Sequence, residues 1–241
     1  MGIKSSIPNI ITLLNLFCGC IAVVFTFNEN FELALLFVAL GIFLDFFDGF
    51  FARLFKVPSP LGVQLDSLAD MVTSGVVPGT IMFFLMRNAL QVKAFSVYDA
   101  DLWMCFAGFV ITLGSCYRLA YFNIDTRQTD SFIGLPTPAN ALFILSLPLI
   151  LKNTDSIFIL ELLTNYWFLL FITIMSAYIL NAEIPLFSLK IKKMNFRDNL
   201  LQIGFLAVAL LLLAFFRYAG LALVIVFYVA TSVVVNQLNK K

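Results

Sequence analysis

The chain has 241 residues, of which 61% are hydrophobic and 12% are charged, and its mean hydropathy is +0.99. This composition excludes an ordinary soluble protein and predicts a polytopic membrane protein. The net charge of +1 gives no reason to expect nucleic acid as a partner, and the absence of histidine and of CxxC spacing among four cysteines excludes a zinc site, a His-ligated haem and a Ser-His-Asp triad.

Eight apolar segments follow one another along the chain, and we expect each to form a membrane helix. Their approximate ranges are 10–27, 32–55, 61–86, 100–123, 138–152, 157–181, 198–216 and 219–237. The first lacks a small-residue cleavage site, so we expect a membrane helix rather than a cleaved signal peptide, with Pro8 ending a short amphipathic piece before it. No repeat divides the chain, and we expect one integral membrane domain over residues 1–241, an all-α bundle of about eight transmembrane helices.

Lysine and arginine are distributed unevenly between the two ends of these predicted helices. If the N-terminus is inside, only four of the 15 basic residues fall on the outer side: Arg87, Lys93, Lys152 and Arg217. Because cytoplasmic loops carry an excess of lysine and arginine, this pattern predicts that both termini are cytoplasmic. We therefore expect a multi-pass protein of the inner (cytoplasmic) cell membrane.

Four aspartates lie within 26 residues of otherwise apolar sequence, at the expected cytoplasmic ends of the second and third helices. Asp45 and Asp48 are three residues apart and share one helix face, and Asp66 and Asp70 are four residues apart and share another. The Pro-Ser-Pro sequence at 58–60 reverses the chain, so a helical hairpin can bring all four carboxylates together. Four like charges in a low dielectric repel one another unless a cation joins them, and oxygen ligands favour Mg²⁺ or Mn²⁺.

Small residues and one arginine accompany these aspartates. Gly49, Ala52 and Gly62 remove side-chain bulk on or near the same faces, so a large or flat molecule is expected to approach the helix backbones there. A divalent cation transporter would also need buried carboxylates, but it gives no reason for Arg53, because a fixed positive charge opposes cation passage. Arg53 is explained if an anion such as a phosphate joins the metal.

The pattern D-x-x-D-G-x-x-A-R, then eight residues, then G-x-x-x-D-x-x-x-D over residues 45–70 matches the signature of the CDP-alcohol phosphotransferases at every fixed position. The chain therefore resembles this family, clearly over the first three helices and by general architecture elsewhere. The resemblance implies an integral membrane enzyme, usually a homodimer. Such an enzyme moves a phosphatidyl or similar group from a CDP-linked donor to an alcohol and releases CMP.

Four further stretches resemble runs found in the same order in bacterial and archaeal phosphatidylserine synthases, a branch of this family. They are PNIITLLNLFCG (8–19), CYRLAYFNI (116–124), FIGLPTPANA (132–141) and PLFSLKIK (185–192). One departure is Tyr121, which stands where those enzymes often have a second basic residue. The resemblance implies CDP-diacylglycerol as donor and L-serine as acceptor, with membrane lipids around the protein. Glycerol phosphate, inositol phosphate and choline remain alternative acceptors, and an ether-linked archaeal lipid is an alternative donor. A divalent cation transporter is the alternative function that is not enzymatic.

The resemblance also implies roles for individual residues at the donor site. One or two Mg²⁺ or Mn²⁺ ions would be held by the four carboxylates of Asp45, Asp48, Asp66 and Asp70. The CDP group would contact the small residues and arginine of the signature and a polar face of the first helix, namely Gly49, Ala52, Arg53, Gly62, Asn9, Thr12 and Asn15. Asp66 and Asp70 are the expected catalytic residues, with Asp70 as the general base that removes the proton of the acceptor hydroxyl.

The acceptor and the lipid need other polar groups. Arginine is the natural bidentate partner of a carboxylate, so Arg118 is the expected contact of the serine carboxylate, with Asn123 beside it. Lys190 and Lys192 are expected to hold a phosphate or a lipid head group.

Overall fold

The computed structural model of the protein describes residues 3–57, 59–93, 95–96, 98–125, 133–187 and 199–239. Within these ranges the chain is helical, with one isolated bridge between Ile133 and Pro185 and no strand, which confirms the predicted all-α class. The elements are α1 (Ile3–Phe27), α2 (Phe31–Leu54), α3 (Pro60–Asp70), η1 (Met71–Val76), α4 (Val77–Ala89), α5 (Ala100–Cys105), η2 (Phe106–Phe109), α6 (Val110–Phe122), α7 (Thr137–Asn153), α8 (Ile157–Leu163), α9 (Tyr166–Asn181) and α10 (Leu200–Asn239).

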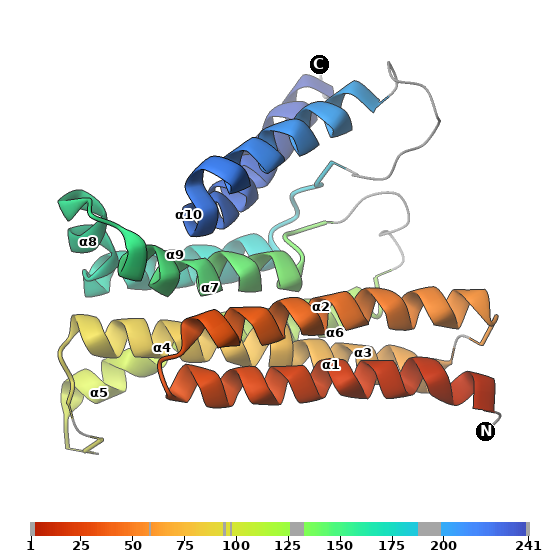
Figure 1. The fold of residues 1–241 in the computed structure, drawn as a ribbon, viewed down its shortest axis with the longest axis horizontal. Coiled ribbons are helices and arrows are strands. Elements are labelled where there is room, and N and C mark those ends of the chain that lie inside the picture. Colours follow the sequence, from red (N-terminus) through yellow and green to blue (C-terminus); the bar gives the residue numbers. More distant parts are fainter. Residues whose placement is uncertain are drawn as a thin grey trace.

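The helices form layers around a central span (Figure 1). Helices α1, α2, α3 and α4 run alongside one another, α7 and α9 lie against this group, and α10 is outermost. All residues from Val77 to Met86 of α4 are buried. In the most apolar part of the span 60–89, 72% of the residues are buried, whereas the corresponding share is 33% in α1 and 22% in α2. The third span is therefore the core of the bundle, and its first part, α3, is held firmly against α1.

Each predicted apolar segment contains helix, but the helices differ in length. Among the described residues, five helices are long and apolar enough to cross a membrane, or six if the bent α8–α9 pair counts as one span. Helix α7 has only 17 residues. Helix α10 consists of two halves that meet at Arg217, where φ is 49° and ψ is −115°, and Figure 1 shows the chain turning back there. These halves correspond to the separate seventh and eighth predicted segments.

Two sequence predictions are wrong in detail. The sixth segment, 157–181, is not one straight helix, because α8 and α9 meet at an angle of 69°. The Asn165 side chain accepts hydrogen bonds from the backbone N–H groups of Trp167 and Phe168, so it caps α9 and starts a new helix. Pro8 does not end a separate piece either, because it lies inside the continuous helix α1.

A widened turn follows Asp70 directly. Residues Met71–Val76 form a π-helix between α3 and α4. Pro78 has no N–H group to donate to the preceding turn. The carbonyl of Gly75, within this turn, accepts a hydrogen bond from Thr112 Oγ1 at 2.9 Å. Such π-helical turns are frequent at functional sites, because they change the direction in which neighbouring side chains point.

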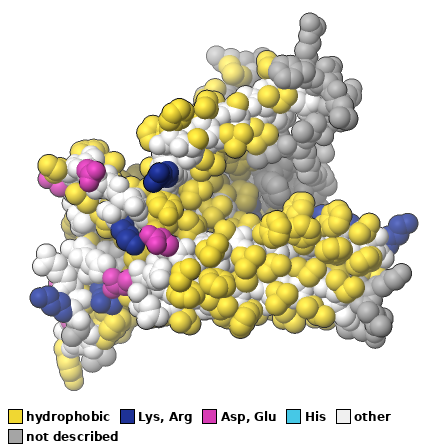
Figure 2. Space-filling view, viewed as in Figure 1, with side chains coloured by type: hydrophobic (Ala, Val, Ile, Leu, Met, Phe, Trp, Pro, Cys, Tyr) yellow, Lys and Arg dark blue, Asp and Glu magenta, His cyan; other side chains and the backbone are white. Residues whose placement is uncertain are grey.

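Charged side chains gather at one end of the molecule. Figure 2 shows hydrophobic side chains over its flank and lysine, arginine, aspartate and glutamate side chains together at the end where α1 passes into α2. Lys152 and Glu32 form an ion pair of 3.0 Å at this end. Both described ends of the chain lie away from it (Figure 1).

Candidate active site

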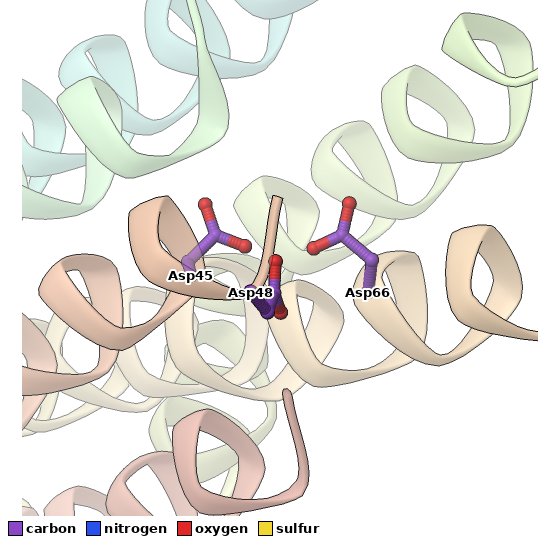
Figure 3. Close-up of side chains that lie close together, drawn as sticks. All are labelled: Asp45, Asp48 and Asp66. Atoms are coloured by element: carbon purple, nitrogen blue, oxygen red, sulfur yellow. The ribbon is translucent and has the colours of Figure 1, made fainter. Parts of the chain in front are cut away.

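Three of the four predicted aspartates come together between α2 and α3. One carboxylate oxygen each from Asp45, Asp48 and Asp66 lies within 4.8 Å of the others. Figure 3 shows the carboxylates of Asp45 and Asp66 pointing toward each other, with Asp48 between them. The i, i+3 spacing on α2 and the chain reversal after it produce this arrangement, as the sequence predicts.

The donor set of this cluster fits a divalent cation. All of its ligand atoms are carboxylate oxygens, and the Asp45 and Asp66 carboxylates lie within hydrogen-bonding reach of each other. Among the described residues, Asp66 Oδ1 is buried and has no hydrogen-bond partner. Carboxylates this close repel one another when both are ionised, so a shared cation would satisfy both the charge and the unpaired oxygen.

Asp70 lies next to this cluster but outside it. Its carboxylate is buried, and Asp70 Oδ1 accepts a hydrogen bond from Asn15 Nδ2 at 3.3 Å. Asn15 is in turn held by Thr73, whose Oγ1 donates to Asn15 Oδ1 at 2.9 Å. The structure therefore turns Asp70 toward α1 and does not bring it into the three-carboxylate cluster, unlike the predicted set of four metal ligands.

A glycine makes this arrangement of buried polar groups possible. A Cβ atom on Gly41 would lie only 2.7 Å from Asn15 Oδ1 and 2.9 Å from Thr73 Cγ2. Helix α2 can therefore approach α1 and η1 closely only because residue 41 has no side chain. Gly41 thus helps to fix the amide of Asn15 that contacts Asp70.

A pocket of about 130 Å³ opens beside the cluster, between α1, α2 and α3. Its lining includes five residues predicted to contact the CDP group, namely Asn9, Thr12, Gly49, Ala52 and Gly62, together with Asp48 and Asp66. Thr12 Oγ1 donates to Asp48 Oδ2 at 2.5 Å, which fixes one metal-ligand candidate against α1. We call this space the α1–α3 pocket.

The other two predicted CDP contacts lie apart from the lining of this pocket. Arg53 is exposed and folds back along α2, where its Nη1 would be 3.3 Å from a Cβ atom on Gly49. Asn15 is fully buried, and its amide is used by Asp70 and Thr73. The predicted polar face of α1 is therefore divided, because Asn9 and Thr12 line the pocket whereas Asn15 lies behind the carboxylates.

A second pocket, of about 190 Å³, surrounds Arg118, and we call it the Arg118 pocket. Its lining consists of Tyr117, Arg118, Tyr121, Asp125, Ile133, Leu180, Asn181, Ala182 and Glu183. Arg118 is only 7% exposed, donates from Nη2 to the Gly134 carbonyl at 3.4 Å, and has a buried Nε without a partner among the described residues. It also interacts electrostatically with the Asp70 carboxylate.

Two loops that are distant in sequence close this pocket. Gly134 N donates to the Ile184 carbonyl at 2.9 Å, and Leu135 N donates to the Ile179 carbonyl at 3.1 Å. Gly134 has φ +75°, and a Cβ atom there would lie 2.5 Å from the Leu180 carbonyl oxygen. Glycine is therefore required at this position, both for its backbone conformation and for the close contact.

The remaining predicted contacts are outside this pocket. Asn123 follows α6, and its Nδ2 donates to Ser67 Oγ of α3 at 2.9 Å, so it connects two helices rather than lining the Arg118 pocket. Lys190 and Lys192 lie outside the described residues.

Comparison with known families identifies the fold that carries these pockets. A family model described as CDP-alcohol phosphatidyltransferase matches residues 5–179, nearly three quarters of the chain. The chain belongs to the CDP-alcohol phosphatidyltransferase family. As a member, it is a membrane-bound transferase, and the three-carboxylate cluster is formed by residues of the family signature.

Individual members of the family are similar over much of their length. A CDP-diacylglycerol–serine O-phosphatidyltransferase of Bacillus subtilis is 34% identical over 132 residues, which cover 55% of this chain and 69% of that protein. The enzyme of the same name from Helicobacter pylori is 32% identical over 203 residues, covering 83% and 79% of the two chains. That of Methanocaldococcus jannaschii is 30% identical over 139 residues, or 58% of each.

The structure brings together stretches that resemble phosphatidylserine synthases. Stretch 116–124 supplies Arg118 and two tyrosines to the Arg118 pocket, and stretch 132–141 supplies Ile133 and the loop at Gly134. Stretch 185–192 begins at Pro185, which bridges to Ile133. Stretch 8–19 lines the α1–α3 pocket and holds Asn15. Three of the four stretches therefore contribute residues to the lining of the two pockets, and the fourth contacts Ile133 in the lining of the Arg118 pocket.

Several site residues were missed by the sequence analysis. Thr73 is hydrogen-bonded to Asn15, and Ser67 is hydrogen-bonded to Asn123. Asp125 and Glu183 line the Arg118 pocket. No spacing rule links these residues to the signature, because their contacts join helices and loops far apart in the chain. Only the polar character of Thr73 and Ser67 within a membrane segment indicated that they needed partners.

Proposed function

We propose that this chain is a CDP-diacylglycerol–serine O-phosphatidyltransferase, which transfers the phosphatidyl group of CDP-diacylglycerol to the hydroxyl of L-serine and releases CMP. The observation that carries the proposal is the position of the Arg118 pocket. A nearly buried arginine with an unpaired Nε lines a small polar pocket and interacts with Asp70, beside the family's aspartate cluster. The names of the similar enzymes support the same acceptor.

The donor half of the reaction uses the cluster and the α1–α3 pocket. Asp45, Asp48 and Asp66 would hold Mg²⁺ or Mn²⁺, which supplies charge neutralisation for the diphosphate and for the departing CMP. Gly49 and Gly62 leave their helix backbones open to the nucleotide in the pocket that they line. The lipid tails remain in the bilayer, because the site lies within membrane helices α2 and α3.

The acceptor half uses the Arg118 pocket. The guanidinium group binds the serine carboxylate, and the buried surroundings strengthen this charge-assisted contact. A choline acceptor would bring a second cation to this arginine and has no anionic group to pair with it. The pocket therefore favours an acceptor that carries a carboxylate.

Asp70 accepts the proton of the serine hydroxyl as the serine oxygen attacks the phosphorus atom that bears the diacylglycerol. A new P–O bond to serine forms, the diphosphate P–O bond breaks, and CMP leaves with the electron pair. Asn15 orients the Asp70 carboxylate through the 3.3 Å hydrogen bond, and Arg118 keeps the acceptor next to it. The sequence contains no histidine, and the family resemblance assigns this proton transfer to Asp70.

The proposal includes a cytoplasmic active site in the inner membrane and a homodimeric assembly. The basic residues favour cytoplasmic termini, and in Figure 1 the aspartate-bearing part of α2 lies away from the α1–α2 turn, on the side of the termini. CMP and L-serine can then enter and leave through water on the same side. The homodimer rests on the family resemblance alone.

The purified full-length chain in lipid nanodiscs is expected to release CMP from CDP-diacylglycerol only when L-serine and Mg²⁺ or Mn²⁺ are both present. Chelation with EDTA should abolish release, and added divalent ion should restore it, because the clustered carboxylates need a cation. CMP release is measured with L-serine, glycerol 3-phosphate, inositol 1-phosphate and choline in separate reactions. Release with none of these alcohols would contradict the enzyme assignment, and release with another alcohol alone would contradict the acceptor.

A further inference from the structure

We propose that the Arg118 pocket binds its acceptor as a zwitterion, with Asp125 and Glu183 as the partners of the α-ammonium group. This inference rests on the proposed function and assigns a specificity-determining role to two carboxylates. We call these two residues the acidic pair.

The pocket contains a cationic side chain with an unused hydrogen-bond donor, which points to an anionic ligand. Arg118 is more than nine-tenths buried, and it lines the pocket with a buried Nε that has no partner in the described parts of the chain. Its one hydrogen bond in these parts, from Nη2 to the Gly134 carbonyl, is long at 3.4 Å. A carboxylate in the pocket would give this guanidinium group the two-fold contact that it prefers.

The same small pocket also contains negative charge. Asp125, directly after α6, is half-buried, whereas Glu183, after α9, is exposed, and both line the 190 Å³ space. Both carboxylates also have interactions of their own within the protein. The acidic pair therefore offers a site for a cation within the same pocket as the buried guanidinium group.

Aromatic rings lie beside the acidic pair. Tyr117 and Tyr121 stack almost in parallel, with ring centres 6.2 Å apart and planes 7° apart, and both line the pocket. Tyr117, Tyr121 and Asp125 follow one another at intervals of four residues, which places them along one side of α6 and its end. Tyrosine faces attract ammonium groups, so this side of the pocket favours a cation.

A pocket with both signs of charge selects for an alcohol that carries both. L-serine has a carboxylate for Arg118 and an ammonium group for the acidic pair. Glycerol phosphate and inositol phosphate would bring a doubly charged anion toward two carboxylates, and choline has no carboxylate for the arginine to bind. The acidic pair thus acts by repelling wrong acceptors as well as by binding the right one.

Acceptors that each lack one charge test this inference. L-serine is compared with 3-hydroxypropanoate, which lacks the ammonium group, and with ethanolamine, which lacks the carboxylate. Each is measured as an acceptor, or as an inhibitor of serine turnover where its own turnover is too slow. The full-length chain is used as wild type, Asp125→Asn, Glu183→Gln and the double variant, with Glu161→Gln on α8 as an exposed acidic control.

The double variant is expected to raise KM for L-serine by about tenfold to a hundredfold, the effect of losing a charge-assisted contact. KM for CDP-diacylglycerol should stay unchanged, and 3-hydroxypropanoate should bind more tightly once the two repelling carboxylates are gone, so the preference for serine over 3-hydroxypropanoate shrinks. Glu183→Asp should retain part of that preference.

An unchanged KM for serine in the double variant would overturn the inference, as would equal losses with serine and 3-hydroxypropanoate. Failure of the proposed function is recognised separately, because the wild-type chain would then release no CMP with serine.

Discussion

Asp70→Asn is expected to lower kcat by about 10²–10⁴-fold, the usual contribution of a general base, while binding of CDP-diacylglycerol is retained. Asparagine keeps the size of the side chain and an oxygen that can accept the hydrogen bond from Asn15 Nδ2. It cannot take a proton from the serine hydroxyl. Because Asp70 lies outside the three-carboxylate cluster, the substitution leaves the proposed metal ligands in place.

The measurement combines CMP release at saturating substrates with direct binding of CDP-diacylglycerol to the protein in nanodiscs. Asp101→Asn, an exposed residue of α5, is the matched control and should behave like wild type. Near-normal turnover of Asp70→Asn would remove Asp70 from the base role.

Asn15→Leu is measured in the same experiment and is expected to have a smaller effect on kcat than Asp70→Asn. It removes the hydrogen bond that orients Asp70 but leaves the base itself, so kcat should fall by about tenfold to a hundredfold, with both KM values little changed. A purely structural role of Asn15 would instead reduce the amount of folded protein without this selective loss of kcat.

Arg118→Ala is expected to raise KM for L-serine by about tenfold to a hundredfold and to leave KM for CDP-diacylglycerol nearly unchanged. The guanidinium group lines the acceptor pocket and is absent from the lining of the α1–α3 pocket. Arg118→Lys should restore little, since a lysine cannot form the two-fold contact with a carboxylate.

Initial rates over a matrix of serine and CDP-diacylglycerol concentrations separate the two KM values. Lys93→Ala, which changes an exposed basic residue after α4, is the control for loss of positive charge. Thermal unfolding of each variant shows whether the lost contact to the Gly134 carbonyl affects folding. Equal increases in both KM values would place Arg118 outside the serine pocket.

Local spacing was sufficient to predict the centre of the site. Asp45 and Asp48 share a face because α2 is a regular helix, and the short turn after α2 places Asp66 opposite them. The small residues at 49, 52 and 62 line one pocket for the same reason. The reversal at Arg217 was also predictable, since a charged residue interrupts an apolar segment there.

Contacts between distant elements were not predictable from spacing. Asn15 was assigned to the nucleotide, but the close approach of α1 to η1 directs its amide to Asp70 and Thr73. Glu183 joins Arg118 in one pocket because the end of α9 and the residues after it pack against the loop at Gly134. The bend between α8 and α9 falls at Thr164 and Asn165, where the Asn165 side chain caps α9, and a hydropathy pattern does not show this.

The lipid that the purified chain makes from a mixture of acceptors tests the central claim most directly. CDP-diacylglycerol and Mg²⁺ or Mn²⁺ are supplied with equal concentrations of L-serine, glycerol 3-phosphate, inositol 1-phosphate and choline, and the lipid products are identified by mass spectrometry. The proposed function predicts phosphatidylserine as the main product, formed in equal amount to CMP. A different phospholipid as the main product, or no new lipid at all, would contradict it.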